Sequence, residues 1–94
     1  MTEKRASERY RLAMPATARP IGGESIELEL HSLSDTGFSG SGDVPQGCDM
    51  TVVVDLPIAG NALARLVWVQ ERAFAGEFLR PVNSERIVDR FYDV

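Results

Sequence analysis

The sequence has few of the residues on which catalysis, metal binding and covalent cross-linking depend. Its 94 residues include one cysteine, Cys48, and one histidine, His31. A single cysteine cannot form an internal disulfide, and it lacks a companion set of metal ligands, so we expect a reduced thiol and no metal site. Because no nucleophile can be placed beside a base, the chain is not predicted to be an enzyme.

Long apolar runs are also missing. Residues 66–69 form the longest such run in the second half of the chain, far short of the roughly 20 residues that a helix needs to cross a bilayer. The charged start of the chain continues into further polar residues rather than into the apolar stretch of a secretory signal. We therefore expect no membrane insertion and a cytoplasmic location.

Charge is unevenly distributed along the chain. Residues 1–19 contain five basic and two acidic residues, a net charge of +3, so that the rest carries −7 in a chain whose total is −4. This acidic body argues against broad contact with DNA or with anionic membranes. The basic N-terminal segment suits a small dianionic ligand, and the alternative for it is a solvated terminus without a ligand.

Short alternating segments separated by glycine and proline turns predict an all-β fold. We expect strands at the following positions, with a further extended stretch after Phe38: residues 16–19, 26–31, 50–56, 63–70 and 73–79. About six such strands predict a small six-stranded antiparallel β-barrel, closed or nearly closed, because closure removes exposed sheet edges. Trp68, which lies between two valines, is expected to anchor the barrel core or its mouth.

The two ends of the chain differ from this pattern. Residues 1–12 have no apolar period and are predicted to be a flexible basic arm, which leaves residues 13–94 as a single barrel domain. A short helix is expected at about residues 83–92, where Asn83 or Ser84 can supply the N-cap. Apolar residues recur there at helical spacing and should pack on the barrel as one stripe: Ile87, Val88, Phe91 and Tyr92.

Side-chain parity changes near residue 31. Leu33 falls on the opposite parity from the apolar residues that precede it, which predicts a bulge near His31 and Ser32. We expect this bulge to turn the side chains of Ser32 and Ser34 outward. His31 itself is expected to be a solvated strand residue.

Two polar clusters carry the functional signal. Arg5 and Arg9 present two guanidinium groups four residues apart, and residues 32–37 (Ser-Leu-Ser-Asp-Thr-Gly) offer small hydroxyls and a glycine that a ligand can approach closely. An arginine matches the O6 and N7 acceptors of guanine, while a second arginine and hydroxyls can bind phosphate. Together the clusters suit a compact planar anion.

Arg5 and Arg9 form the pattern R-x-x-x-R, and residues 32–37 form S-x-S-x-x-G. This pair of motifs resembles the signature of PilZ domains, R-x-x-x-R followed by (D/N)-x-S-x-x-G. PilZ domains are receptors for cyclic di-GMP. Residues 9–16 are similar to the start of that family's first strand, and residues 64–69 and 76–78 are similar to its late hairpin, so the resemblance covers nearly the whole chain. It implies a non-catalytic receptor that binds cyclic di-GMP, orders its N-terminal arm on doing so and signals to a partner protein.

The resemblance also implies which residues bind the ligand. They lie in or beside the two polar clusters: Lys4, Arg5, Arg9, Ser32, Ser34 and Gly37. Ser32 stands where the family usually has Asp or Asn, and losing a charge-assisted hydrogen bond to guanine costs on the order of 1.5–3 kcal/mol. Asp35 could partly substitute for the missing acid.

Two other functions stay open. A degenerate PilZ-like adaptor would keep the fold, would not bind cyclic di-GMP and would act through protein contacts, as the serine at position 32 allows. A small barrel that binds single-stranded nucleic acid is disfavoured by the acidic body and by a content of only 7% aromatic residues.

Overall fold

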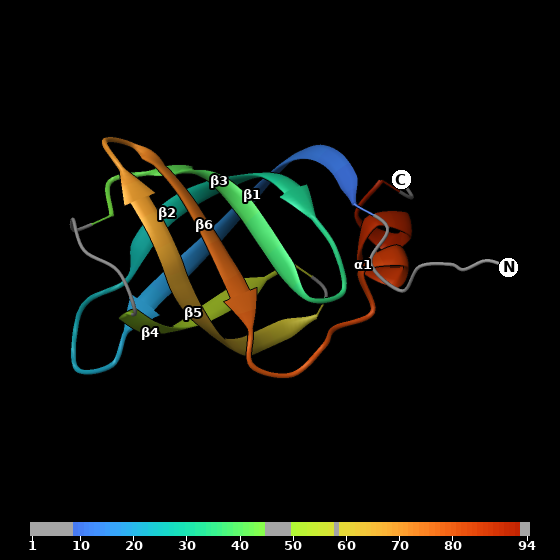
Figure 1. The fold of residues 1–94 in the computed structure, drawn as a ribbon. Helices are drawn as coiled ribbons and strands as arrows, with labels where there is room; N and C mark the ends of the chain where they lie inside the picture. Colours follow the sequence, from blue (N-terminus) through green and yellow to red (C-terminus); the bar gives the residue numbers. More distant parts are fainter. Residues whose placement is uncertain (1–8, 45–49, 58, 93–94) are drawn as a thin grey trace, which may run out of the picture.

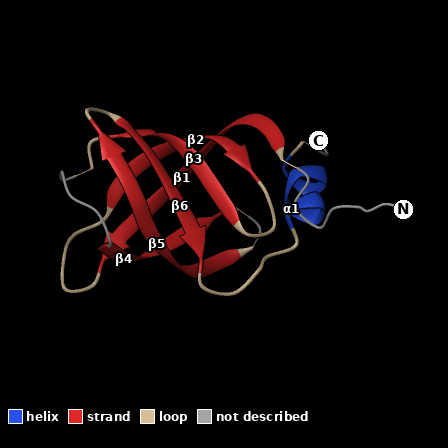
Figure 2. Ribbon diagram, in the orientation of Figure 1, coloured by secondary structure: helices blue, strands red, loops and turns tan. Residues whose placement is uncertain are grey.

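The computed structural model describes residues 9–44, 50–57 and 59–92. Within them, six antiparallel strands close into a barrel, and one short helix lies at one end of it (Figure 1; Figure 2). The elements in chain order are β1 (Tyr10–Pro20), β2 (Ile26–Leu33), β3 (Gly37–Gly42), β4 (Met50–Leu56), β5 (Gly60–Gln70), β6 (Ala73–Phe78) and α1 (Ser84–Phe91). Neighbouring strands follow the order β1-β2-β3-β6-β5-β4 around the barrel. The predicted fold class is confirmed.

Inward-facing side chains from every strand fill the barrel. Phe38 of β3 is 1% exposed, and its ring centroid lies 4.9 Å from that of Phe78 and 6.2 Å from that of Phe74. Gly76 makes room for this aromatic cluster, because a Cβ atom at position 76 would collide with the Phe38 ring. The core therefore depends on a small residue facing a large one across β3 and β6.

The first strand is longer than the sequence predicted. β1 begins at Tyr10 and so starts before the predicted domain boundary at residue 13. Met14, Ala16 and Ala18 are buried and alternate with more exposed residues, which shows that the alternation of a half-buried strand continues past Pro15. The remaining part of the predicted arm, residues 1–8, lies outside the described residues.

Trp68 was expected in the barrel core or at its mouth, and a position in the core is wrong. Its side chain is 45% exposed, whereas Leu66 is 1% exposed. The β5–β6 register shifts between these two residues: Leu66 pairs with Gly76 and Trp68 with Ala75, so that Val67 is an extra residue on β5. Such a bulge reverses the side-chain parity, and the residue that regular alternation would bury therefore points outward.

The predicted C-terminal helix is confirmed, and it packs on one end of the barrel (Figure 1). The side chain of Asn83 caps α1, with its Oδ1 accepting a hydrogen bond of 3.1 Å from the backbone N–H of Arg86. Ile87 is 3% exposed and joins the hydrophobic core, while Val88 and Phe91 pack against that core partly buried. Tyr92, at the end of the predicted apolar stripe, is 53% exposed.

Candidate functional site

A hollow of about 450 Å³ lies on the outer face of the barrel where β1, β2 and β3 are neighbours. We call it the cationic hollow and define it by its lining residues: Arg9, Arg11, His31, Ser32 and Ser39. Guanidinium, imidazole and hydroxyl groups all carry hydrogen-bond donors, and no carboxylate is among the described residues that line the hollow. The hollow is therefore suited to an anion.

Two shifts of strand register bring these side chains together. Arg11, Ser32 and Ser39 pair with one another in turn across β1, β2 and β3. The β1–β2 register shifts between Arg11 and Met14, and the β2–β3 register shifts between Leu30 and Ser32. These irregularities confirm the bulge predicted near Ser32, and they concentrate polar side chains at one point of the sheet.

A chain of hydrogen bonds crosses the cationic hollow. Arg9 Nη1 donates to Ser32 Oγ at 2.7 Å, and Ser32 Oγ lies 2.5 Å from Ser39 Oγ. Arg9 and Ser32 were predicted from two separate motifs, 23 residues apart in the sequence, and the structure brings them into direct contact. Whether they bind ligand stays a prediction. Lys4 and Arg5, which share that prediction, lie outside the described residues, as does Cys48.

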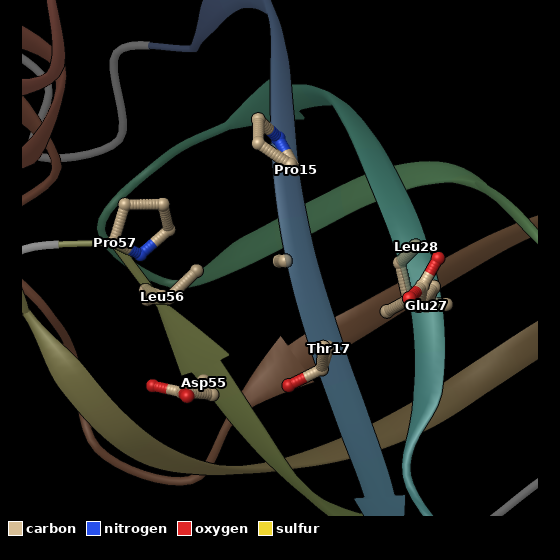
Figure 3. Close-up of a pocket in the computed structure, with 8 residues that line it drawn as sticks. Pro15, Thr17, Glu27, Leu28, Asp55, Leu56 and Pro57 are labelled. Atoms are coloured by element: carbon tan, nitrogen blue, oxygen red, sulfur yellow. The ribbon is translucent and has the colours of Figure 1, made fainter.

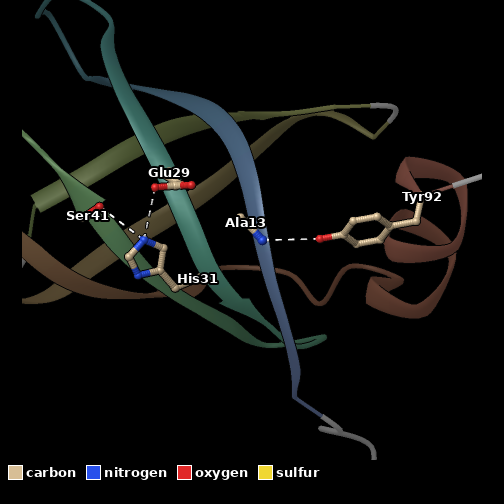
Figure 4. A network of polar contacts seen from close by, with 5 residues as sticks. All are labelled: Ala13, Glu29, His31, Ser41 and Tyr92. Atoms are coloured by element: carbon tan, nitrogen blue, oxygen red, sulfur yellow. Dashed lines mark hydrogen bonds and ion pairs between the residues drawn. The ribbon is translucent and has the colours of Figure 1, made fainter.

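His31 connects the edge of the hollow to the neighbouring polar side chains of the sheet. Its Nε2 atom lies 3.5 Å from Glu29 Oε1 and 3.3 Å from Ser41 Oγ (Figure 4). The side chains of His31 and Glu29 are about half exposed, in agreement with the expectation of a solvated strand residue. Glu29 thus pairs with the imidazole and does not line the hollow.

The expected outward orientation of Ser34 is wrong. Ser34 is 1% exposed, and its Oγ accepts from the backbone N–H of Gly37 at 3.1 Å and donates to the Gly37 carbonyl at 3.3 Å. The hydroxyl closes the turn between β2 and β3 instead of facing solvent. Gly37 is needed for close packing, because a Cβ atom there would lie 2.9 Å from the Gly76 carbonyl oxygen. Ligand contacts of Ser34 and Gly37 stay predictions.

Asp35 is directed toward α1 and away from Ser32. Its Oδ1 atom accepts hydrogen bonds from the backbone N–H of Ser84 at 2.9 Å and from Ser84 Oγ at 2.6 Å. At the other end of α1, the backbone N–H of Ala13 in β1 donates to the Tyr92 hydroxyl at 3.4 Å (Figure 4). The helix therefore contacts both chain segments that flank the cationic hollow. Whether Asp35 can also substitute for an acid at position 32 in ligand binding stays a prediction.

Two small side chains, Ser39 and Ala75, extend from the hollow across the sheet, and we call this pair the shelf. Ser39 pairs with Ala75, and Ala75 pairs with the exposed Trp68, so the row of paired residues continues from β3 through β6 to β5. Since neighbouring strands lie about 4.8 Å apart, Trp68 is roughly 14 Å from Ser32, three strands away. The indole is thus within reach of a ligand of dinucleotide size that occupies the hollow.

Sequence reasoning missed Arg11, His31, Ser39 and Trp68 as members of this surface. Arg11 could have been found, because it lies two residues after Arg9, which immediately precedes β1, and alternation along an extended chain places both side chains on the same face. The other three depend on strand register across bulges, and no local pattern in the sequence indicates that register.

A second hollow, of about 420 Å³, lies farther along β1 (Figure 3). We call it the acidic hollow. Its carboxylates are those of Glu27 on β2 and Asp55 on β4, which both pair with Thr17 of β1. Its complete lining is Pro15, Ala16, Thr17, Glu27, Leu28, Asp55, Leu56 and Pro57.

The part of the chain that the structure describes holds no group of three or more His, Cys, Asp or Glu residues that could bind a metal ion. None of its helices has the length and apolar character needed to cross a membrane.

No family model and no curated protein matches the chain. Among solved structures, it is similar to the complex of MrkH of K. pneumonia with c-di-GMP, with a TM-score of 0.50 and 16% sequence identity. The similarity covers 96% of this chain and 50% of the MrkH chain, so the chain spans about half the length of that protein. At this identity the likeness establishes a shared fold.

Proposed function

We propose that this chain is a non-catalytic, PilZ-like receptor that binds cyclic di-GMP at the cationic hollow. The observation that carries the proposal is the contact of Arg9 with Ser32, because it joins the two predicted ligand-binding motifs in a hollow lined with donors. The likeness of the fold to MrkH, solved as a complex with c-di-GMP, supports the proposal.

Arg9 can exchange its present partner, Ser32, for a phosphate of the ligand with a net gain in binding free energy. In the free chain Arg9 donates to a neutral hydroxyl oxygen of Ser32. This contact already has a charged donor, and a phosphate oxygen would add a full negative charge on the acceptor side, which makes the hydrogen bond shorter and stronger. An anionic phosphate is therefore the stronger partner for the guanidinium, and Arg11 can bind the guanine O6 and N7 acceptors from the same hollow.

Trp68 offers a surface for the rest of the ligand. Its exposed indole lies at the end of the shelf formed by Ser39 and Ala75, whose small side chains leave the sheet open between the hollow and the ring. A base that lies on this shelf can stack on the indole, which contributes about 1–3 kcal/mol per base. We assign the second guanine to this position.

The N-terminal arm completes the proposed site. Lys4 and Arg5 would close over the bound dinucleotide and neutralise its phosphates. Ordering the arm creates a surface for a partner protein, and α1 can transmit the change because it is hydrogen-bonded to Asp35 and to Ala13. We place this receptor in the cytoplasm.

Calorimetric titration of the full chain with cyclic di-GMP tests the proposal. We expect saturable binding that weakens as salt is added, because the recognition is largely ionic. Arg5→Ala should weaken binding by about tenfold or more, the loss of one charge-assisted contact. Arg19→Ala, at the other end of β1, should leave the affinity unchanged. Absence of binding at millimolar ligand would contradict the proposal.

An adaptor without a nucleotide is the second candidate, and one observation favours it. Leu63 and Leu79 are 49% and 54% exposed and adjacent, with the backbone N–H of Leu79 donating to the Leu63 carbonyl at 2.9 Å. Exposed apolar side chains that lie together are typical of protein contact surfaces. If cyclic di-GMP does not bind, this surface becomes the leading candidate for function.

A further inference from the structure

We propose that a groove beside the end of β6 binds an extended segment of a partner protein, in which apolar residues alternate with aspartate or glutamate. The groove has a volume of about 540 Å³, and we call it the edge groove. This proposal goes beyond nucleotide binding and does not depend on it. The lining of the edge groove includes Asn61, Ala62, Leu63, Leu79, Arg80 and Val82.

The edge groove exists because the chain leaves the sheet after β6. Strand β6 ends at Phe78, and one further hydrogen bond of 2.9 Å joins the Leu79 N–H to the Leu63 carbonyl. The Val82 N–H then donates to the Asp35 carbonyl at 2.8 Å, and the chain continues to α1 (Figure 1). Among the described strands, the first residues of β5 are therefore paired with β4 alone.

The main chain of Asn61 lies at this open edge. Strand residues two apart direct their N–H and C=O groups to the same side of the strand. The Leu63 carbonyl faces Leu79, so the N–H and C=O groups of Asn61 face the same side, away from its β4 partner Asp55. A peptide that adds to a sheet edge takes its affinity from such groups, and it must be extended to reach them. The geometry therefore favours a strand over a helix as the occupant.

Apolar side chains border the open edge. Leu63 and Leu79 are hydrogen-bonded neighbours that are 49% and 54% exposed, and Val82 packs partly buried against the core. Neighbouring exposed apolar side chains mark a contact surface. Because side chains of a strand alternate between its two faces, an added strand presents every second residue to this surface. Those residues should be apolar.

The charge of the edge groove selects the other residues of the partner segment. Arg80 lines the groove, and Arg86 lines an adjoining hollow that shares Val82. Both arginines are exposed, and no carboxylate is among the described residues that line either space. The whole chain carries −4, so this cationic surface contrasts with the charge of the molecule. Carboxylates at the alternate positions complement the two guanidinium groups, and a basic segment is repelled.

Selection of short random peptides displayed on phage tests the chemistry of the occupant. The target is the immobilised full chain, with no nucleotide present, so that failure here leaves the proposed cyclic di-GMP site untouched. We expect enriched peptides in which Leu, Ile or Val alternates with Asp or Glu. No enrichment over the bare support, or enriched peptides without acidic residues, would overturn the proposal.

The most enriched peptide, synthesised with a fluorescent label, locates the site by anisotropy titration. Leu63→Ser and Arg80→Glu should each weaken binding by at least about tenfold. The matched controls are Ile21→Ser, which removes an apolar side chain that is 66% exposed, and Arg72→Glu, which reverses an exposed arginine outside the groove. Both should bind within about twofold of wild type. Full affinity in a folded Leu63→Ser variant would overturn the proposal.

Hydrogen exchange on the wild-type chain tests strand addition itself. The Asn61 amide should exchange more slowly once the peptide is bound, because its N–H gains a main-chain acceptor. Unchanged exchange at saturating peptide would overturn this binding mode. Sedimentation of the free chain tests a second copy as the occupant: dimerisation that Leu63→Ser abolishes would assign the edge groove to self-association and overturn the proposal.

Discussion

The cationic and the acidic hollow have nearly the same size and lie along the same strand, yet they differ in sign and in geometry. Their volumes are about 450 Å³ and about 420 Å³, and β1 contributes to both. Arg9 and Arg11 line the first, whereas Glu27 and Asp55 line the second. Size therefore does not decide which surface suits a cyclic dinucleotide. The sign of the charge and the role of the polar groups as donors decide it.

Strand register explains the difference in geometry. The acidic hollow lies where the ladders are regular, so Glu27 and Asp55 are separated by Thr17 and lie two strands apart, about 10 Å. The cationic hollow lies at two register shifts, and its side chains converge to contacts of 2.7 Å and 2.5 Å. Convergent side chains can bind one ligand together, while evenly spaced ones act separately.

Removing the central guanidinium should have the largest effect. Arg9→Ala deletes the donor that contacts Ser32, and we expect cyclic di-GMP affinity to fall by about tenfold to a hundredfold, the cost of one charge-assisted contact. Isothermal calorimetry measures the change, with Arg19→Ala as the matched arginine on the same strand. If Arg9→Ala binds within twofold of wild type, the cationic hollow is not the site.

Removing the hydrogen bonds between α1 and the turn that joins β2 to β3 should reduce stability. Asp35→Ala removes the acceptor for the Ser84 N–H and hydroxyl, and Ser84 is only 2% exposed. Leaving buried donors without a partner costs about 1–3 kcal/mol of unfolding free energy. Urea denaturation measures this loss, and Asp89→Ala, an exposed acid on the same helix, is the control. Equal stability of both variants would show that the Asp35 contact does not hold the helix.

Neutralising the acidic hollow should have the smallest effect. Glu27→Gln with Asp55→Asn removes the two negative charges that flank Thr17 of β1. We expect cyclic di-GMP affinity to change by no more than about twofold, because exposed charges in a separate hollow are largely screened by salt. The same calorimetric titration measures it. A tenfold loss would instead indicate that the acidic hollow takes part in binding.

The fold could be predicted from the sequence because its signals are local. The valine-rich run at residues 50–56 predicted β4 with the observed bounds, and the two capping candidates, Asn83 and Ser84, indicated where α1 starts. Two expectations failed, for different reasons: Trp68 was placed by its neighbouring valines, and Ser34 by the predicted bulge near Ser32. At Trp68 an extra residue on β5 reverses the parity, and at Ser34 the hydroxyl bonds to Gly37.

The site was only partly predictable. Arg9 and Ser32 could be proposed from their motifs, whereas their contact across 23 residues required the fold. Ser39 lies in a run of serine and glycine that has no distinguishing local feature, and only the pairing of β2 with β3 brings it to Ser32. Register is a property of two strands, so a pattern read along one strand cannot supply it.

Amide chemical-shift mapping of the ¹⁵N-labelled chain during titration with cyclic di-GMP tests the central claim most directly. The account predicts saturable shifts at Arg11, Ser32 and Ser39, with Thr17 and Asp55 unchanged. Shifts confined to Thr17 and Asp55, or no shifts at saturating ligand, would contradict it.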